Sequence, residues 1–96
     1  MKEYRVRFTP EAAQCISRLH PDHKKIIRNA LEQLFREPFA GDDLQEELAE
    51  FKSFKPRRFR IIYTVNHDHR LIHVYYVSLR KDVYDQFRLL LDKLKP

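Results

Sequence analysis

The sequence of 96 residues is long enough for one hydrophobic core and leaves little protein for a deep, enclosed pocket. Hydrophobic residues make up 43% and charged residues 34%, a globular composition that excludes an intrinsically disordered chain. The formal net charge of +5 favours a polyanionic partner, because cations that neutralise phosphates release condensed counterions.

The first elements are a strand and a short helix. Residues 4–8 alternate apolar and charged types, which is the period-two pattern of a half-buried strand. Thr9 is expected to cap a helix with Pro10 at its first position, where a backbone N–H would have no hydrogen-bond partner within the helix. That helix ends at residues 20–22, which we expect to start another.

A longer amphipathic helix follows. Its apolar residues recur at helical spacing and form one stripe, while the charged residues lie elsewhere on its surface. The stripe contains Ile26, Ile27, Ala30, Leu31, Leu34 and Phe35. Residues 38–41 end this helix. The two helices are joined too tightly for any arrangement except an αα-hairpin.

The segment from residue 42 to 56 changes from acidic to basic. Five carboxylates lie in residues 42–50, which we interpret as a solvated loop. The alternatives are that this segment masks the basic residues or docks a basic partner. Phe51 and Phe54 then flank Lys52 and indicate an irregular strand that ends at Pro56.

Two further strands and a helix complete the chain. Apolar and aromatic residues at positions 59, 61, 63 and 65 alternate with the residues between them, and residues 71–77 are rich in β-branched and aromatic types. The polar turn at residues 66–69 joins these strands into an antiparallel hairpin. An apolar stripe at positions 83, 87, 90, 91 and 94 indicates a terminal amphipathic helix.

The resulting order, β-α-α-β-β-β-α, belongs to the α+β class. We expect an antiparallel sheet with the N-terminal helical hairpin packed on one face, and a C-terminal helix. Repeats, low-complexity tracts and linkers are absent from the sequence, so residues 1–96 are expected to form one domain.

The sequence also indicates a compartment. Cys15 is the single cysteine, which rules out an intramolecular disulfide and fits a reducing environment. Residues 1–8 lack the apolar core of a signal peptide, and no apolar run approaches the roughly 20 residues of a membrane span. We therefore expect a soluble, cytoplasmic protein that does not enter a membrane.

The most conspicuous group of residues is a basic cluster on the predicted sheet. Arg58 and Arg60 are two apart on a strand and are expected to project from the same face. The neighbouring segments add Lys52, Lys55, Arg80 and Lys81. Such a surface can bind phosphates, stack an unpaired base on an aromatic ring and cleave RNA without a metal. The alternative interpretation is the solvated, charged face of a sheet.

Two other groups receive ordinary interpretations. His67, Asp68 and His69 are metal-ligand types, but a catalytic zinc site needs a third protein ligand and supporting residues that the sequence does not supply. We interpret them as a solvated hairpin turn. Cys15 has no paired histidine and is interpreted as a buried, inert thiol. We expect no metal and no cofactor.

Two stretches resemble the RelE/ParE toxin family. Residues 51–63, FKSFKPRRFRIIY, combine a lysine-rich strand with an aromatic-Arg-aliphatic-aliphatic-Tyr strand. Residues 77–84, VSLRKDVY, place a late Arg/Lys pair before Val-Tyr. The β-α-α arrangement before them agrees, so the resemblance covers essentially the whole chain. The motifs are short, and their order and spacing together carry the match.

The resemblance implies the toxin of a type II toxin–antitoxin system, bound by a cognate antitoxin in a hetero-oligomer. In the RelE branch, the toxin enters the ribosomal A site and cuts messenger RNA as a metal-independent endoribonuclease, through attack by the RNA 2′-hydroxyl. Translation is inhibited as a result. ParE-like members share the fold but inhibit DNA gyrase by binding, which is the alternative function. The terminal helix is interpreted as core, and the alternative is that an antitoxin helix competes for its groove or covers the basic face.

Carried over by position, the resemblance assigns roles to individual residues. Arg60 matches the arginine that contacts the scissile phosphate. Arg80 matches the late cation that stabilises the transition state, with Lys81 in its place if the alignment shifts by one. Tyr84 matches the tyrosine that stacks on a base or takes part in proton transfer.

The lysines and the remaining cations complete the implied site. Lys52 and Lys55 correspond to the lysine pair that serves in charge stabilisation and acid/base chemistry, and which of them is the base stays open. Arg57, Arg58 and Lys81 are expected to contact RNA.

Overall fold

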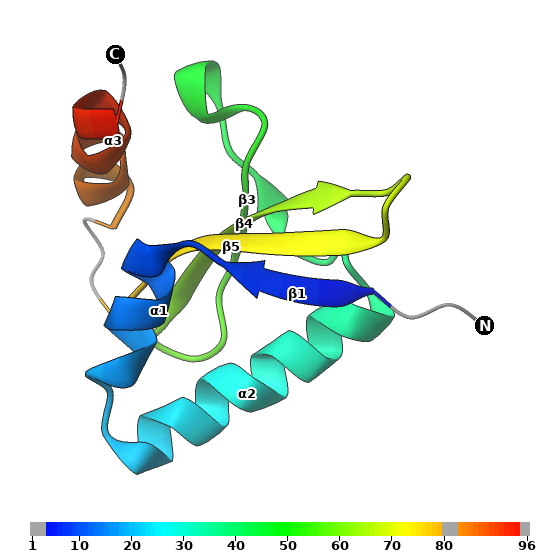
Figure 1. Cartoon of the computed structure of the whole chain (residues 1–96), viewed down its shortest axis with the longest axis vertical. Coiled ribbons are helices and arrows are strands. Elements are labelled where there is room, and N and C mark those ends of the chain that lie inside the picture. The colour runs from blue at the N-terminus through cyan, green and yellow to red at the C-terminus, as the bar shows by residue number, and fades with distance from the viewer. Residues whose placement is uncertain (1–3, 80–82, 95–96) are drawn as a thin grey trace.

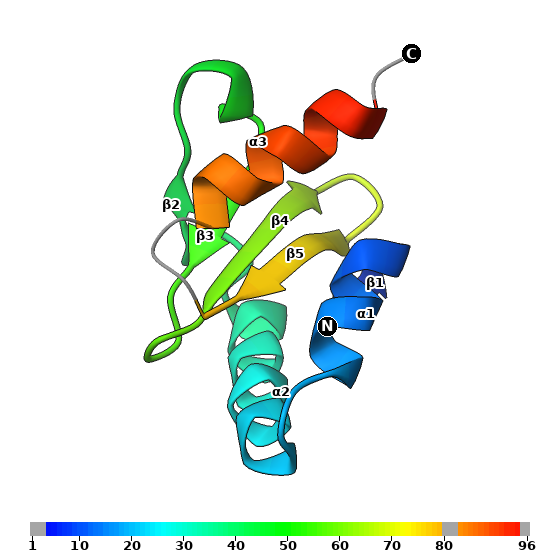
Figure 2. The same ribbon diagram turned by 90° about the vertical axis from the view of Figure 1, so that its left-hand side faces the viewer.

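A computed structural model describes residues 4–79 and 83–94, and its centre is one mixed sheet of five strands with helices on both faces (Figure 1, Figure 2). In chain order the elements are β1 (Arg5–Phe8), α1 (Pro10–Ser17), α2 (Pro21–Arg36), β2 (Asp42–Asp43), the 3₁₀ helix η1 (Glu46–Leu48), β3 (Lys52–Phe54), β4 (Arg60–Asn66), β5 (Leu71–Ser78) and α3 (Val83–Leu94). The strands lie in the order β1-β5-β4-β3-β2. The predicted α+β class is confirmed, with the hairpin α1–α2 against one face of the sheet and α3 against the other.

The sheet differs from the prediction in two respects. The prediction of a wholly antiparallel sheet is wrong at β1, which runs parallel to β5. No tight turn joins β1 to β5, because the chain passes from β1 directly into α1 and reaches β5 only later. Since α1 packs on β5, the path through the helices sets the direction of β1. The second difference is β2, which pairs antiparallel with β3 where the sequence predicts a loop.

The helices start where the sequence predicts. Thr9 Oγ1 accepts a hydrogen bond from the N–H of Ala12 at 3.1 Å, and Pro10 opens α1. The same hydroxyl donates to the carbonyl of Tyr75 at 3.0 Å, which ties the start of α1 to β5. His20 provides the equivalent side-chain cap for α2. In the described part of the chain, no helix combines the length and the apolar character that crossing a membrane requires.

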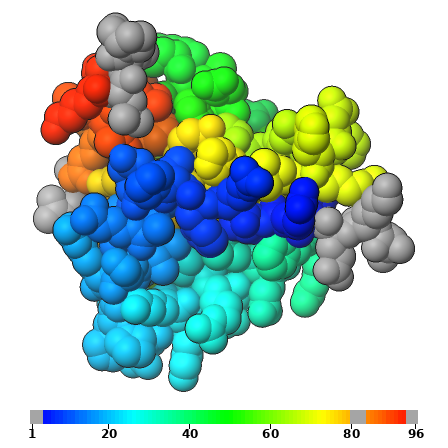
Figure 3. Space-filling view, in the orientation of Figure 1, coloured from blue at the N-terminus to red at the C-terminus, as the bar shows by residue number. Residues whose placement is uncertain are grey.

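Two hydrophobic clusters hold the layers together. The cluster between the sheet and α1–α2 contains Ala12, Ile27, Ala30, Leu34, Phe59, Ile61, Tyr63, Ile72, Val74 and Val77. The cluster between the sheet and α3 contains Leu48, Phe51, Ile62 and Phe87. Figure 3 shows β1, in dark blue, at the sheet edge between these two layers. We call the side of the sheet that carries Ile62 the α3 face, and the opposite side the hairpin face.

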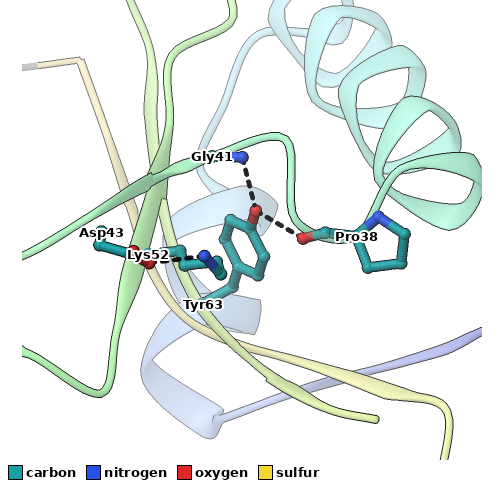
Figure 4. Close-up of polar contacts among 5 residues, drawn as sticks. All are labelled: Pro38, Gly41, Asp43, Lys52 and Tyr63. Carbon is teal, nitrogen blue, oxygen red and sulfur yellow. Dashed lines mark hydrogen bonds and ion pairs between the residues drawn. The ribbon is translucent and has the colours of Figure 1, made fainter.

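A buried tyrosine fixes the loop that follows α2 (Figure 4). The Tyr63 hydroxyl donates to the carbonyl of Pro38 at 2.8 Å and accepts from the N–H of Gly41 at 3.0 Å. Burial raises the pKa of Tyr63 to about 12, so this hydroxyl stays protonated at neutral pH. A Cβ at position 41 would lie 2.6 Å from the hydroxyl oxygen, so glycine is the residue that fits. These two hydrogen bonds therefore hold the loop in place, and the loop positions β2 beside β3.

Candidate nucleic-acid interface

The register of the sheet decides which side chains share the α3 face. Residues paired across neighbouring strands project from the same side. Ser53 pairs with Ile62, and Arg60 pairs with Ser78, two positions along β4 from Ile62. Ser53, Arg60 and Ser78 therefore lie on the α3 face. Tyr84 belongs to the first turn of α3 and packs against the cluster beneath that helix.

A hydrogen bond joins β3 to α3 on this face. The Oγ atom of Ser53 lies 2.8 Å from the hydroxyl oxygen of Tyr84, and either group can donate. Ser53 is 1% exposed and, besides the Tyr63 hydroxyl, is the one polar side chain in the buried core of the described residues. It therefore orients the Tyr84 hydroxyl from a position that water does not reach. The sequence prediction missed Ser53, although a small polar residue between Phe51 and Phe54 is the signal that points to it.

Arg60 places a cation on the α3 face. It is half-buried at the start of β4, and its Nη1 donates to the carbonyl of Phe59 at 2.9 Å. Its guanidinium has no carboxylate partner among the described residues, and a guanidinium has five N–H donors, so most of them stay available to a ligand. A partly buried arginine in this state suits a bidentate contact with a phosphate group.

Lys55 supplies a second cation on the same face. Asp42 pairs with Ser53 across β2 and β3, so the Asp42 side chain projects to the α3 face. Lys55 Nζ lies 3.4 Å from Asp42 Oδ2, which brings the lysine to that face as well. The Lys55 side chain is 47% exposed, so water screens this ion pair and its opening costs little.

Lys52 lies on the opposite side of the sheet. It pairs with Tyr63 across β3 and β4, and Tyr63 belongs to the cluster on the hairpin face. The Lys52 ammonium binds Asp43 and lies 5.4 Å from the centre of the Phe39 ring. Figure 4 shows the contact with Asp43 beside the buried tyrosine. The structure therefore does not bring Lys52 together with Arg60.

The turn before β4 separates two arginines that the sequence predicts on one face. That prediction is wrong, because β4 begins at Arg60 while Arg57 and Arg58 lie in the preceding turn. Both turn arginines line a pocket with His23 of α2, which places them on the hairpin side. The basic cluster is therefore divided between the two sides of the sheet.

Carboxylates neutralise part of the basic cluster. Asp42 and Asp43 pair with the two lysines, and Glu47 lies 2.8 Å from Nε of Arg88 in α3. The acidic segment is exposed, as expected of a solvated loop, but its ion pairs agree with the alternative in which it masks basic residues. By contrast, no carboxylate of the described residues pairs with the arginines at positions 57, 58 and 60.

The other residues singled out in the sequence are the late cations, the histidine-containing turn and the cysteine. Arg80 and Lys81 lie outside the residues that the structure describes. His67 lies in the turn between β4 and β5, with its Nδ1 2.7 Å from the Tyr4 hydroxyl. Across residues 4–79 and 83–94, no three histidine, cysteine or acidic side chains gather as metal ligands would. Cys15 is half-buried on α1, slightly more open than expected.

The known proteins with similar sequences and structures are toxins of toxin–antitoxin systems. No protein-family model matches the sequence. The chain is 31% identical over 83 residues to Toxin RelG of Mycobacterium tuberculosis, across 84% of this chain and 95% of that protein. It matches a chain of the toxin–antitoxin complex RelBE2 of the same organism with a TM-score of 0.75 and 30% identity, over 82% of this chain and 100% of that one. A mutant of the Escherichia coli toxin RelE in the free state has the same fold, with a TM-score of 0.76 at 14% identity, over 98% of this chain and 100% of that one.

Proposed function

The chain belongs to the RelE family of toxins, and we propose that it cuts messenger RNA on the ribosome as a metal-independent endoribonuclease. The observation that carries this proposal is the α3 face. It joins an arginine that has no carboxylate partner within residues 4–79 and 83–94, a lysine in an exposed ion pair and a tyrosine whose hydroxyl is held by Ser53. These are the residue types that the family resemblance assigns to cleavage. We also propose that residues 1–96 act as one domain in the cytoplasm.

The proposed chemistry divides three tasks among these side chains. Attack by the RNA 2′-hydroxyl requires removal of its proton, stabilisation of the charge on the phosphate and protonation of the leaving 5′-oxygen. Arg60 would hold the phosphate, and Lys55 would add charge and a proton donor once its ion pair opens. The Tyr84 hydroxyl would exchange a proton, or its ring would stack on a base. Arg80 completes the proposed set as the late cation.

The RNA path and the protein partner extend this proposal. Arg57, Arg58 and Lys81 would contact the RNA outside the cleavage site. A cognate antitoxin would bind the toxin in a hetero-oligomer and block it. The similarity to the toxin–antitoxin complex RelBE2 supports such a partner.

The two lysines allow a direct comparison. We expect Lys55→Ala to slow messenger-RNA cleavage on programmed ribosomes by about 10-fold to 10²-fold, because it removes a cation and a proton donor from the α3 face. Lys52→Ala should stay within about threefold of the native rate, because Lys52 lies on the hairpin face. Each variant removes one positive charge and one ion pair with an aspartate of β2, so each serves as the control for the other. Equal losses in both variants would contradict the division of the lysines between the two faces.

The alternative is a gyrase inhibitor of the ParE type, which shares the fold. Expression of the toxin without antitoxin separates the two functions, with incorporation of labelled amino acids and DNA breaks measured in the same culture. The proposed function predicts that protein synthesis stops first and that DNA stays intact. DNA breaks and filamentation with continuing protein synthesis would replace the proposed function with the alternative.

A further inference from the structure

A second group of residues lies away from the α3 face and has no role in the proposed cleavage chemistry. The turn between β3 and β4 lies beside α2, and between them is a pocket of about 410 Å³. We call it the turn pocket, and its lining residues are His23, Ile26, Arg57, Arg58, Phe59 and Leu79. We propose that the turn pocket binds one unpaired nucleotide of RNA, with the base inside it and the phosphate on the turn arginines.

The walls of the turn pocket suit a planar, apolar ring. Phe59 lines the pocket and is 2% exposed. The His23 ring meets it edge-on, with the ring centres 5.3 Å apart, and stays half-buried. Leu79 also lines the pocket and is 44% exposed, so its side chain is accessible to a ligand. An imidazole face and an exposed leucine together offer a base a stacking surface and an apolar wall.

The exposed arginines of the lining favour an anion. Arg57 and Arg58 line the pocket, and neither has a carboxylate partner among the described residues. The described lining contains no acidic side chain. Lys52 and Lys55, by contrast, are already paired with the aspartates of β2. A nucleotide combines a planar ring with a phosphate, and one sugar separates the two. The ring matches the apolar lining of the pocket, and the phosphate matches its two arginines.

The groove continues beyond the turn pocket along α2. A second hollow, of about 260 Å³, shares Ile26 and Arg57 with the first and is also lined by Asn29 and Gln33. Amide side chains can donate to and accept from base edges and sugar hydroxyls. The shared arginine therefore lies between two compartments, as a phosphate contact between two neighbouring nucleotides would require.

The backbone of the turn adds an independent observation. Arg57 has φ 57°, a left-handed conformation that glycine or asparagine adopts with less strain. Arginine is therefore a more strained choice than glycine or asparagine at this position. We infer that the turn carries an arginine because its side chain has a function. Arg57→Asn removes the cation while keeping a residue that tolerates this backbone conformation.

Arg70 supplies a matched control for that variant. It has φ 50°, lies in the turn between β4 and β5, and stacks near the Tyr4 ring. Arg70→Asn therefore makes the same substitution in the same backbone conformation with the same loss of charge. Non-specific attraction to RNA falls equally in both variants.

The test measures binding of a labelled single-stranded RNA dodecamer by fluorescence anisotropy, using the antitoxin-free full chain and no ribosomes. We expect Arg57→Asn to weaken binding about tenfold and Arg70→Asn less than about threefold. Leu79→Ala should weaken RNA binding about threefold or more, and leave the affinity for inorganic polyphosphate unchanged, because polyphosphate has no base. Equal losses in the two asparagine variants, or equal effects of Leu79→Ala on both ligands, would overturn the proposal.

Nuclear magnetic resonance locates the binding site directly. On addition of the RNA, the ring signals of His23 and the methyl signals of Leu79 are expected to shift. Shifts confined to Ser53 and Tyr84, or tighter binding of a glutamate-rich peptide at His23, would overturn the nucleotide site. The inference rests on the proposed function only in taking RNA as the ligand. Because the binding assay involves no cleavage, a toxin that binds RNA here without cutting it fails the proposed function alone.

Discussion

Arg60→Ala is expected to lower the rate of messenger-RNA cleavage on programmed ribosomes by about 10²-fold or more. Arg60 is a half-buried cation on the α3 face with no carboxylate partner among the described residues. In the proposed mechanism it is the group that meets the phosphate as negative charge builds up. An alanine at this position leaves the negative charge on the phosphate without a bidentate hydrogen-bond donor. A water molecule carries no positive charge and cannot substitute for the guanidinium.

The fold should tolerate this substitution. Within the described residues the Arg60 side chain makes one hydrogen bond, to the carbonyl of its neighbour Phe59, so the free energy of unfolding is expected to change by about 1 kcal/mol or less. Arg60→Lys should recover part of the rate, because it restores the charge without the planar fork. Arg5→Ala, at the far edge of the sheet on β1, is the control for loss of one charge. A folded Arg60→Ala variant that cuts at the native rate would remove Arg60 from the site.

Phe87→Ala is expected to lower the free energy of unfolding by about 3–5 kcal/mol, as measured by urea denaturation. Phe87 is 1% exposed and is the residue of α3 in the buried cluster on the α3 face. Its ring meets Phe51 edge-on at 4.9 Å and Tyr75 at 6.3 Å between ring centres. Truncation leaves a cavity between α3 and the sheet that the surrounding strands cannot fill.

Leu89 of the same helix is the matched control. It is 62% exposed, so Leu89→Ala should change the free energy of unfolding by less than about 0.5 kcal/mol. Because Phe87 holds α3 against the sheet, its loss should also release Tyr84 from Ser53 and slow cleavage. Equal stability of the two variants would mean that α3 contributes little to the folded state, and that the contact between Tyr84 and Ser53 is not maintained by packing.

The local signals in the sequence predicted most of the elements. Thr9 and Pro10 start α1 through a side-chain cap that depends only on neighbouring residues. The stripe from Ile26 to Phe35 predicted α2 because a surface helix buries one face. The hairpin of β4 and β5 followed from its β-branched residues and its polar turn. In each case the signal is carried by residues that lie close together in the sequence.

The faces of β3 could not be predicted in the same way. Phe51 packs under α3, whereas Phe54 packs against the hairpin face, because helices cover both sides of the sheet. Alternation of apolar and polar residues fails where both faces are buried. Lys52 and Lys55 therefore looked equivalent in the sequence, and only the pairing of Lys52 with Tyr63 and of Asp42 with Ser53 separates them.

Two strands depended on distant partners. β2 consists of two aspartates, residues that disfavour strands, and it forms because Tyr63 holds the preceding loop against the edge of β3. β1 was predicted as a strand, but its parallel pairing with β5 joins residues far apart in the sequence. Ser53 was missed for a related reason, since its partner Tyr84 comes from α3.

The measurement that tests the proposed function most directly is the cleavage of one messenger RNA by the antitoxin-free toxin, with and without programmed ribosomes. We expect cuts at the ribosomal A site that require the ribosome and that disappear in Arg60→Ala. RNA that stays intact on ribosomes, with folded toxin that still binds its antitoxin, would contradict the proposed endoribonuclease function.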